Sequence, residues 1–200
     1  GLEPGMSVLD LGTGSGAALR AAAAAVGSTG EVLGVDLAPG MVERIRREMS
    51  QVPQVSVALG DAENPPSRAG GWDAAIAALL LFYLPDPVAS SARTREVLRS
   101  GGVLVASTFD SPDERWSIVE AALSPYWPPS VGPSHPSGAS PFATVESTEQ
   151  ILRDAGYVDI DTEIVEHVNT YTDVEHWLQW TWSGGARGMW ERVPASDLPA

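Results

Sequence analysis

Apolar runs and amphipathic stretches alternate along the first 109 residues of the chain. The apolar runs have the length of strands, and the stretches between them repeat apolar residues at helical spacing. We expect strands at 7–12, 31–37, 54–61, 72–81 and 103–109, and helices at 15–27, 39–50 and 86–102. Because this alternation implies βαβ crossovers, it predicts an α/β fold with a doubly wound, mainly parallel sheet and helices on both faces.

Three of these elements carry further local signals. The run 72–81 is continuously apolar, which is typical of a strand buried on both faces. The stretch 86–102 ends with the glycine pair Gly101 and Gly102, which is expected to close that helix. The helix at 39–50 has one apolar face, formed by Met41, Val42, Ile45 and Met49.

The pattern changes after residue 110. Residues 124–141 are rich in proline, serine and glycine, so we expect a long loop that acts as a lid, an inert excursion being the alternative. We expect a helix near 147–156, a half-buried strand at 158–168, and a tryptophan-rich helix at 172–185. The expected capping pairs are Ser147 with Gln150 and Thr172 with Glu175.

Length, charge and cysteine content narrow the class of protein. The 200 residues suffice for one domain, with a core at 5–110 and a substrate-covering region at 111–200. The net charge of −14 argues against nucleic acid and anionic membranes as partners. The absence of cysteine and of any long apolar run suits a cytoplasmic enzyme. Oligomeric state is not deducible.

The stretch VLDLGTGSG (8–16) is the first candidate for chemistry. Gly12, Gly14 and Gly16 stand between an expected strand and an expected helix, where a ligand can lie on the backbone and face the helix N-terminus. A merely tight turn would need one glycine rather than three. Many nucleotide sites share such a loop, so the motif alone does not fix the ligand.

Two acids end the next two expected strands. Asp36 follows Gly16 by 20 residues, where a carboxylate can accept hydrogen bonds from both hydroxyls of a ribose. Asp61 can accept from an exocyclic amine such as that of adenine, with the backbone of Ala62 beside it. The alternatives are a solvated acid before a helix and a turn cap, respectively.

A third acid separates two classes of nucleoside-binding enzyme. Gly12, Gly14 and Ala17 formally satisfy the dinucleotide fingerprint, but Asp10 stands just before the loop. A carboxylate there would repel a pyrophosphate, whereas it suits the ammonium group of an amino-acid ligand.

Together these segments resemble class I methyltransferases that use S-adenosylmethionine (SAM), in the small-molecule branch that includes the ubiquinone and menaquinone biosynthesis enzymes. The match covers residues 5–109. The segments similar to the family's successive motifs are VLDLGTGSG, VLGVDLAPGMVERIRRE, VSVALGDAENPP, WDAAIAALLLFYLPDP and VLRSGGVLVASTF. The resemblance implies a Rossmann-like fold, SAM as cofactor and S-adenosylhomocysteine (SAH) as its product. The implied cofactor-binding residues are Asp10, Gly12, Thr13, Gly14, Gly16, Asp36, Leu37, Met41, Asp61, Ala62 and Ala78.

The sequence departs from the family pattern in two ways. Phe82 and Tyr83 stand where the family often has histidines, which makes this wall more apolar. The family sheet ends in a hairpin with an antiparallel last strand; residues 158–168 would be its first arm, and the second arm is missing from the chain. We therefore expect a chain that is trimmed at both ends.

Methyl transfer from SAM needs a base only when the acceptor must lose a proton. The candidates for a catalytic group are Tyr83, His135 and His176, each of which can equally be structural. No metal-ligand cluster stands out. Aromatic residues gather after the last expected strand and suggest an aromatic or polyketide-type natural product as the small-molecule substrate: Trp116, Tyr126, Trp127, Trp177, Trp180 and Trp182.

Two other functions remain open at this stage. A protein with this fold can retain SAM without methylating, as a cyclase or a binding module. An NAD-linked oxidoreductase is the third possibility, and Asp10 and Asp61 disfavour it.

Overall fold

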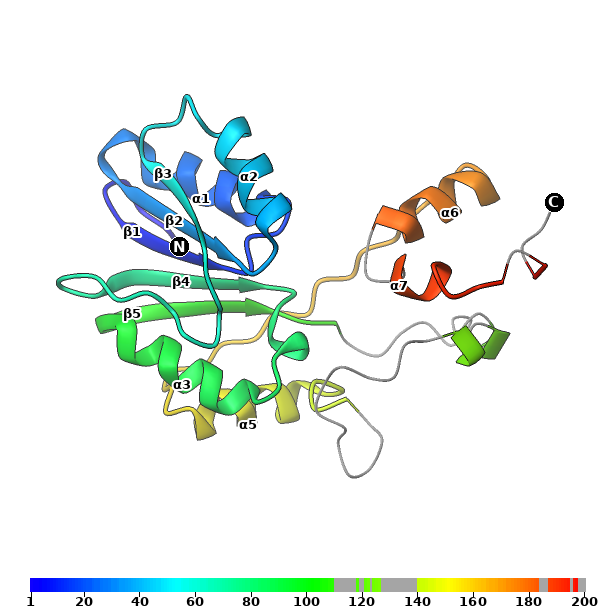
Figure 1. Ribbon diagram of the computed structural model, residues 1–200. Coiled ribbons are helices and arrows are strands. Elements are labelled where there is room, and N and C mark those ends of the chain that lie inside the picture. The colour runs from blue at the N-terminus through cyan, green and yellow to red at the C-terminus, as the bar shows by residue number, and fades with distance from the viewer. Residues whose placement is uncertain are drawn as a thin grey trace.

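The computed structural model describes residues 1–109, 118, 121–122, 124–126, 140–183, 187–194 and 196–197. Strands and helices alternate through its first half, as the sequence predicts (Figure 1). The strands are β1 (Ser7–Leu11), β2 (Glu31–Asp36), β3 (Val55–Leu59), β4 (Trp72–Ala78) and β5 (Leu98–Ser107). The helices include α1 (Ala17–Val26), α2 (Pro39–Glu48), α3 (Pro87–Val97), α5 (Val145–Asp154), α6 (Val174–Ser183) and α7 (Arg187–Trp190).

The five strands form one sheet in the order β3-β2-β1-β4-β5, and every neighbouring pair is parallel. Helices α1 and α2 lie on one face, and α3 and α5 on the other (Figure 1). The chain thus winds outward from β1 in both directions, which confirms the doubly wound α/β fold. The order also makes the junction between β1 and β4 the switch point, where ligands bind such sheets.

Each face of the sheet has its own apolar core because a strand alternates its side chains. One core joins Val8 of β1 to Leu19 of α1 and Ile45 of α2, all fully buried. The other joins Leu9 of β1 to Trp72 of β4 and also includes Ile151 of α5. The sheet is therefore fixed from both sides, and the loops at its carboxyl edge stand on a rigid support.

The boundary between α3 and β5 differs from the prediction. The helix ends at Val97, and Leu98 already pairs with Trp72. Gly101 and Gly102 therefore lie inside β5 rather than at a helix end, beside a register shift opposite Trp72 and Ala74. Gly101 has φ 73°, which a residue with a side chain rarely adopts. The glycines therefore allow the irregular backbone of β5 at the register shift.

The predicted strand at 158–168 is wrong. This segment forms no strand in the structure, and its apolar side chains are exposed, including Val158, Ile164 and Val168. The alternating pattern is real, but no other described strand pairs with the segment. Alternation alone does not make a strand, because the backbone groups also need a partner.

Both predicted capping pairs are also wrong. Helix α5 begins one turn earlier than expected, because Thr144 and Ser147 cap each other reciprocally. At the start of α6, Asp173 Oδ1 accepts from the backbone N–H of His176 at 2.8 Å. In both cases a polar residue close to the predicted one in sequence caps the helix instead. A motif of fixed spacing does not tell which of several neighbouring polar residues is the N-cap.

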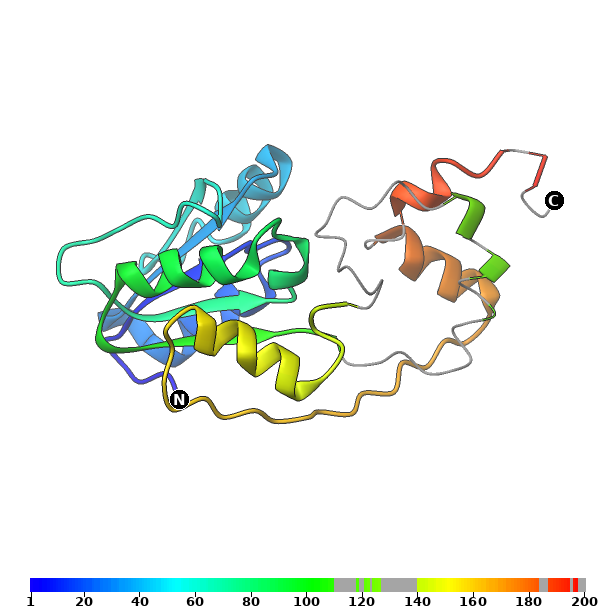
Figure 2. The same cartoon turned by 90° about the horizontal axis from the view of Figure 1, so that it is seen from below.

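Helices α6 and α7 lie apart from the sheet, beyond the carboxyl ends of β4 and β5 (Figures 1 and 2). An extended segment connects α5 to them. Most of the predicted lid at 124–141 lies outside the described residues. No helix in the described part of the chain is both long enough and apolar enough to cross a bilayer.

Candidate active site

The glycine loop connects β1 to α1 at the switch point. Gly12, Gly14 and Gly16 have φ values of 62°, 50° and 79°, which explains why all three lack side chains. A Cβ on Gly12 would lie 2.7 Å from Leu80 Cδ1, and one on Gly16 would lie 3.0 Å from Ile45 Cδ1. At Gly14 the nearest atom would be 3.7 Å away, so only this glycine leaves the space beside it open.

Asp36 joins the glycine loop to the end of β2. Its Oδ2 accepts from the N–H of Gly14 at 2.7 Å, and its Oδ1 accepts from the N–H of Ala38 at 2.8 Å. These bonds fix the carboxylate plane, and each oxygen keeps a further lone pair. The carboxylate is therefore oriented in advance for a ligand with two adjacent hydroxyl groups.

Asp61 follows β3 and starts a turn. Its Oδ1 accepts from the N–H of Glu63 at 2.9 Å, and its carbonyl accepts from the N–H of Asn64. The turn-cap alternative is thus correct for one oxygen of this side chain. The other oxygen, Oδ2, accepts no hydrogen bond from the described residues and remains free for a ligand.

Asp10 lies beneath the loop and is only 1% exposed. Its Oδ2 accepts from Thr13 Oγ1 at 2.6 Å. Burial raises the pKa of Asp10 to about 6, although the hydrogen bond from Thr13 acts in the opposite direction. This carboxylate titrates close to neutrality and sits within the support of the loop rather than on its surface.

A cavity of about 320 Å³ lies among these loops. Five of the predicted cofactor-binding residues line it, together with Tyr83 and four residues that the sequence analysis missed. The predicted ones are Gly12, Asp36, Leu37, Asp61 and Ala62, and the missed ones are Gly60, Leu79, Leu80 and Leu84. The three leucines lie in or just after the apolar run 72–81 and therefore look like core residues in the sequence. They line the cavity because the chain turns after β4, and the sequence pattern does not show this turn.

The other predicted cofactor-binding residues do not line the cavity. Thr13, Gly14 and Gly16 belong to the same loop as Gly12. Met41 lies in the first turn of α2 and is 40% exposed, so it does not share the burial of Val42 and Ile45 on that helix. Ala78 is the last residue of β4 and is exposed.

The catalytic candidates fall in different places. Tyr83 lines the cavity and is 59% exposed. His176 lies in α6, where its ring contacts Tyr171 and its Nδ1 accepts from the N–H of Thr172 at 3.3 Å, so the structure does not place it with the cavity. His135 lies outside the described residues.

Trp177 and Trp182 of α6 pack on Trp190 of α7, whereas Trp180 lies against Tyr171. Trp190 is buried, its ring lies 6.2 Å from that of Trp177 and 6.4 Å from that of Trp182, and its Nε1 donates to Thr181 Oγ1 at 2.9 Å. This packing gives Trp177 and Trp182 a structural role, and their part in a substrate pocket stays a prediction. Trp116 and Trp127 lie outside the described residues.

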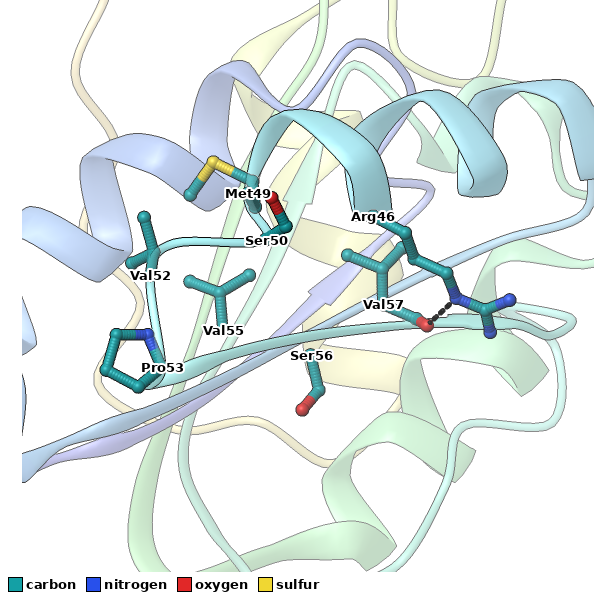
Figure 3. A pocket seen from close by; sticks show the side chains of 8 residues that line it. All are labelled: Arg46, Met49, Ser50, Val52, Pro53, Val55, Ser56 and Val57. Atoms are coloured by element: carbon teal, nitrogen blue, oxygen red, sulfur yellow. Dashed lines mark hydrogen bonds between the residues drawn. The ribbon is translucent and has the colours of Figure 1, made fainter.

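A second, larger cavity of about 400 Å³ lies at the end of α2 and along β3 (Figure 3). There Arg46 Nε donates to the carbonyl of Val57 at 2.7 Å and satisfies an acceptor on the edge strand. None of the predicted site residues lines this groove. We interpret it as a structural feature of the sheet edge.

A glycine loop at the switch point, with acids after the next two strands, is the arrangement of nucleoside-binding α/β enzymes. Comparisons with known proteins narrow this class. A methyltransferase domain family matches residues 8–102. The chain is 34% identical over 205 residues to a nocamycin O-methyltransferase of Saccharothrix syringae, an alignment that covers 96% of this chain and 73% of that protein.

Two further likenesses agree. The chain is 37% identical over 134 residues to an aklanonic acid methyltransferase of Streptomyces sp. (strain C5), covering 66% of this chain and 57% of that protein. A SAM-dependent methyltransferase from Aquifex aeolicus shares the fold, with a TM-score of 0.59 at 23% identity over 78% of this chain and 74% of that one. The chain belongs to the class I SAM-dependent methyltransferases, and SAM is its methyl donor.

Proposed function

We propose that the protein transfers the methyl group of SAM to an oxygen atom of a small, acidic organic acceptor of the aromatic or polyketide type. The observation that carries the proposal is the convergence of Asp36 and Asp61 on one cavity beside the glycine loop. Two relatives described above, an O-methyltransferase and a methyltransferase of an acid, support the choice of acceptor.

In this proposal the loops after β1, β2 and β3 each bind a different part of SAM. Asp36 accepts from the ribose hydroxyls through its remaining lone pairs, and Asp61 Oδ2 accepts from the adenine amine. Leu37 and Ala62 cover the faces of the nucleoside, since both line the cavity. The glycine loop from Gly12 to Gly16 receives the methionine part, whose ammonium is attracted by Asp10. Met41 and Ala78 remain predictions.

The reaction is an in-line displacement. A lone pair of the acceptor oxygen attacks the methyl carbon, the bond from that carbon to sulfur breaks, and sulfur keeps the electron pair as the thioether of SAH. Because the sulfonium is already an activated leaving group, the protein mainly has to align the two partners and exclude water.

An acidic acceptor removes the need for a strong base. Of the described residues that line the cavity, only Asp36, Asp61 and Tyr83 are titratable. A carboxylic acid or an acidic hydroxyl is already ionised near neutral pH and attacks without further help. A neutral alcohol would need a base that this part of the chain does not provide.

The test is transfer of label from methyl-labelled SAM to an acceptor panel of matched aromatic carboxylic acids, phenols, alcohols and amines. We expect labelled methyl esters or ethers together with stoichiometric SAH, and no product from the amines or neutral alcohols. Labelled amines would contradict the choice of oxygen. Conversion of a substrate without any SAH would instead support a cyclase or another protein that does not methylate.

A further inference from the structure

The turn after β4 contains a leucine in an unusual backbone conformation. Leu79 has φ 51°, in the left-handed region that residues with side chains rarely occupy. It follows the last residue of β4, lines the donor cavity and is 43% exposed. Such a conformation persists only where the surroundings hold it, and it is found mostly at functional sites.

Ser107 supplies the restraint from the neighbouring strand. The N–H of Leu79 donates both to the carbonyl oxygen of Ser107 at 3.2 Å and to its Oγ at 3.1 Å. Ser107 is the last residue of β5 and pairs with Ala78. The hydroxyl therefore adds a side-chain acceptor where the ladder between β4 and β5 ends.

This turn directs the following residues to two different places. Leu80 reaches the glycine loop, where its Cδ1 would lie 2.7 Å from a Cβ on Gly12. Tyr83 turns to the cavity and is 59% exposed. The turn at Leu79 thus places Leu80 under the glycine loop of the donor site and Tyr83 in the adjacent cavity wall.

That wall is aromatic and continues onto β5. The ring of Phe82 lies 4.5 Å from that of Tyr83 and 5.5 Å from that of Phe109. Phe109 follows β5 by two residues and is 64% exposed, although it is a large apolar side chain. Tyr83 lines the cavity, and the half-buried Phe82 connects it to the exposed Phe109. Such an aromatic row beside a cavity is suited to stack a flat ligand.

We propose that Phe109 determines specificity for a planar aromatic acceptor and that Ser107 is the positioning residue that holds this wall in place through Leu79. The inference rests on the proposed function, since it assigns the acceptor side of the same site. It adds the shape of the acceptor and the residues that select it.

The test compares two acids of equal carbon skeleton, planar 2-naphthoic acid and saturated decahydro-2-naphthoic acid, by calorimetry on the SAH-loaded protein. We expect the planar acid to bind more tightly, by about tenfold, because only it can stack on the aromatic row. Phe109→Ala should abolish this preference. Ser107→Ala should reduce it, and Ser107→Thr, which keeps the hydroxyl, should restore it.

Val105→Ala is the matched control, because Val105 lies on β5 two residues from Ser107 and is also exposed. It should leave the preference unchanged, and every variant should bind SAH like the parent protein. Equal binding of the two acids by the parent protein would overturn the inference. So would a preference that survives Phe109→Ala, or one that is undiminished in Ser107→Ala. The parallel SAH titration keeps this separate from the proposed function, because failure to bind SAH would refute the donor site itself.

Discussion

Three carboxylates at one edge of the sheet differ in their surroundings and therefore in their roles. Asp10 is buried, Asp36 is held by two backbone N–H groups, and Asp61 leaves one oxygen free. Burial raises the pKa of Asp10 to about 6. Asp36 and Asp61 thus stay available to a polar ligand, whereas the ionised form of Asp10 is poorly stabilised in the folded protein.

Asp10 makes stability depend on pH. Its pKa is 3.8 in an ordinary setting and about 6 in the folded protein, so the folded state holds a proton that the unfolded chain releases. Stability is therefore lost as pH rises between these values, and the cost above them is about 3 kcal/mol at about 1.4 kcal/mol per unit.

The measurement is urea unfolding of the ligand-free parent and of Asp10→Asn from pH 4 to pH 7.5. We expect the variant to gain stability relative to the parent as pH rises, because it has no charge to bury. Other groups titrate alike in both proteins and cancel in the difference. A constant difference across this range would show that Asp10 is not the source of the dependence.

Residue types and spacing predicted Asp36 and Asp61, but they did not predict the neighbour of Gly12. The sequence suggested a ligand as the reason for the missing side chain, whereas the structure places Leu80 of the turn after β4 against it. Leu80 is 68 residues further along the chain. Such a contact depends on β4 lying beside β1, which no local pattern contains.

At the scale of elements, the periodicity located the five strands and their helices well, and it failed at boundaries. Leu98 was expected in a helix and begins β5, because pairing with Trp72 outweighs a weak helical preference. The leucines at 79–81, which form the turn after β4, were expected in the strand, because an apolar run does not reveal where strand pairing ends.

The cap of α5 gives a test of one such boundary. Thr144 accepts from the N–H of Ser147 at 3.1 Å, whereas the sequence had suggested Ser147 with Gln150 as the capping pair. Thr144→Ala should lower the free energy of unfolding by about 1 kcal/mol. Gln150→Ala, the comparison variant, should have little effect in the same urea titration. The reverse order would restore the original interpretation.

The loop after β3 is held in place by helix α3. Arg93 of α3 donates through Nε to the carbonyl of Glu63, and its Nη2 lies 3.3 Å from Glu63 Oε1. Glu63 in turn donates its N–H to Asp61. The position of Asp61 thus depends on Arg93 and Glu63, neither of which lines the cavity itself.

Removing this pair should weaken the donor site indirectly. We expect Arg93→Ala to raise the dissociation constant for SAH by about fivefold, because Asp61 loses its support. Arg44→Ala removes an exposed pair with Glu48 on α2 and serves as the control. Calorimetry on both variants tests the prediction, and equal affinities would show that the loop holds its shape without Arg93.

At the scale of the whole molecule, residues 7–109 were predictable because local pattern and global fold agree there. Strands β1, β2 and β4 are each followed by a helix that packs on the sheet, whereas β3 leads to β4 through a loop. The alternation of strand and helix periods therefore carries most of the topology. Residues 158–168 have a strand pattern without a partner strand among the described residues. The tryptophans of α6 and α7 formed their own cluster, which helical spacing alone could not distinguish from a pocket.

The central claim is that the cavity at the carboxyl ends of the strands holds SAM through Asp36. The most direct measurement is calorimetric titration of the protein with SAM, SAH and NAD in parallel, repeated on Asp36→Ala and on Glu43→Ala, an exposed acid of α2. We expect SAM and SAH to bind and NAD not to bind. Affinity should fall by about a hundredfold in Asp36→Ala only, because two hydrogen bonds to a charged group are lost. Unchanged SAM affinity in Asp36→Ala would contradict the account.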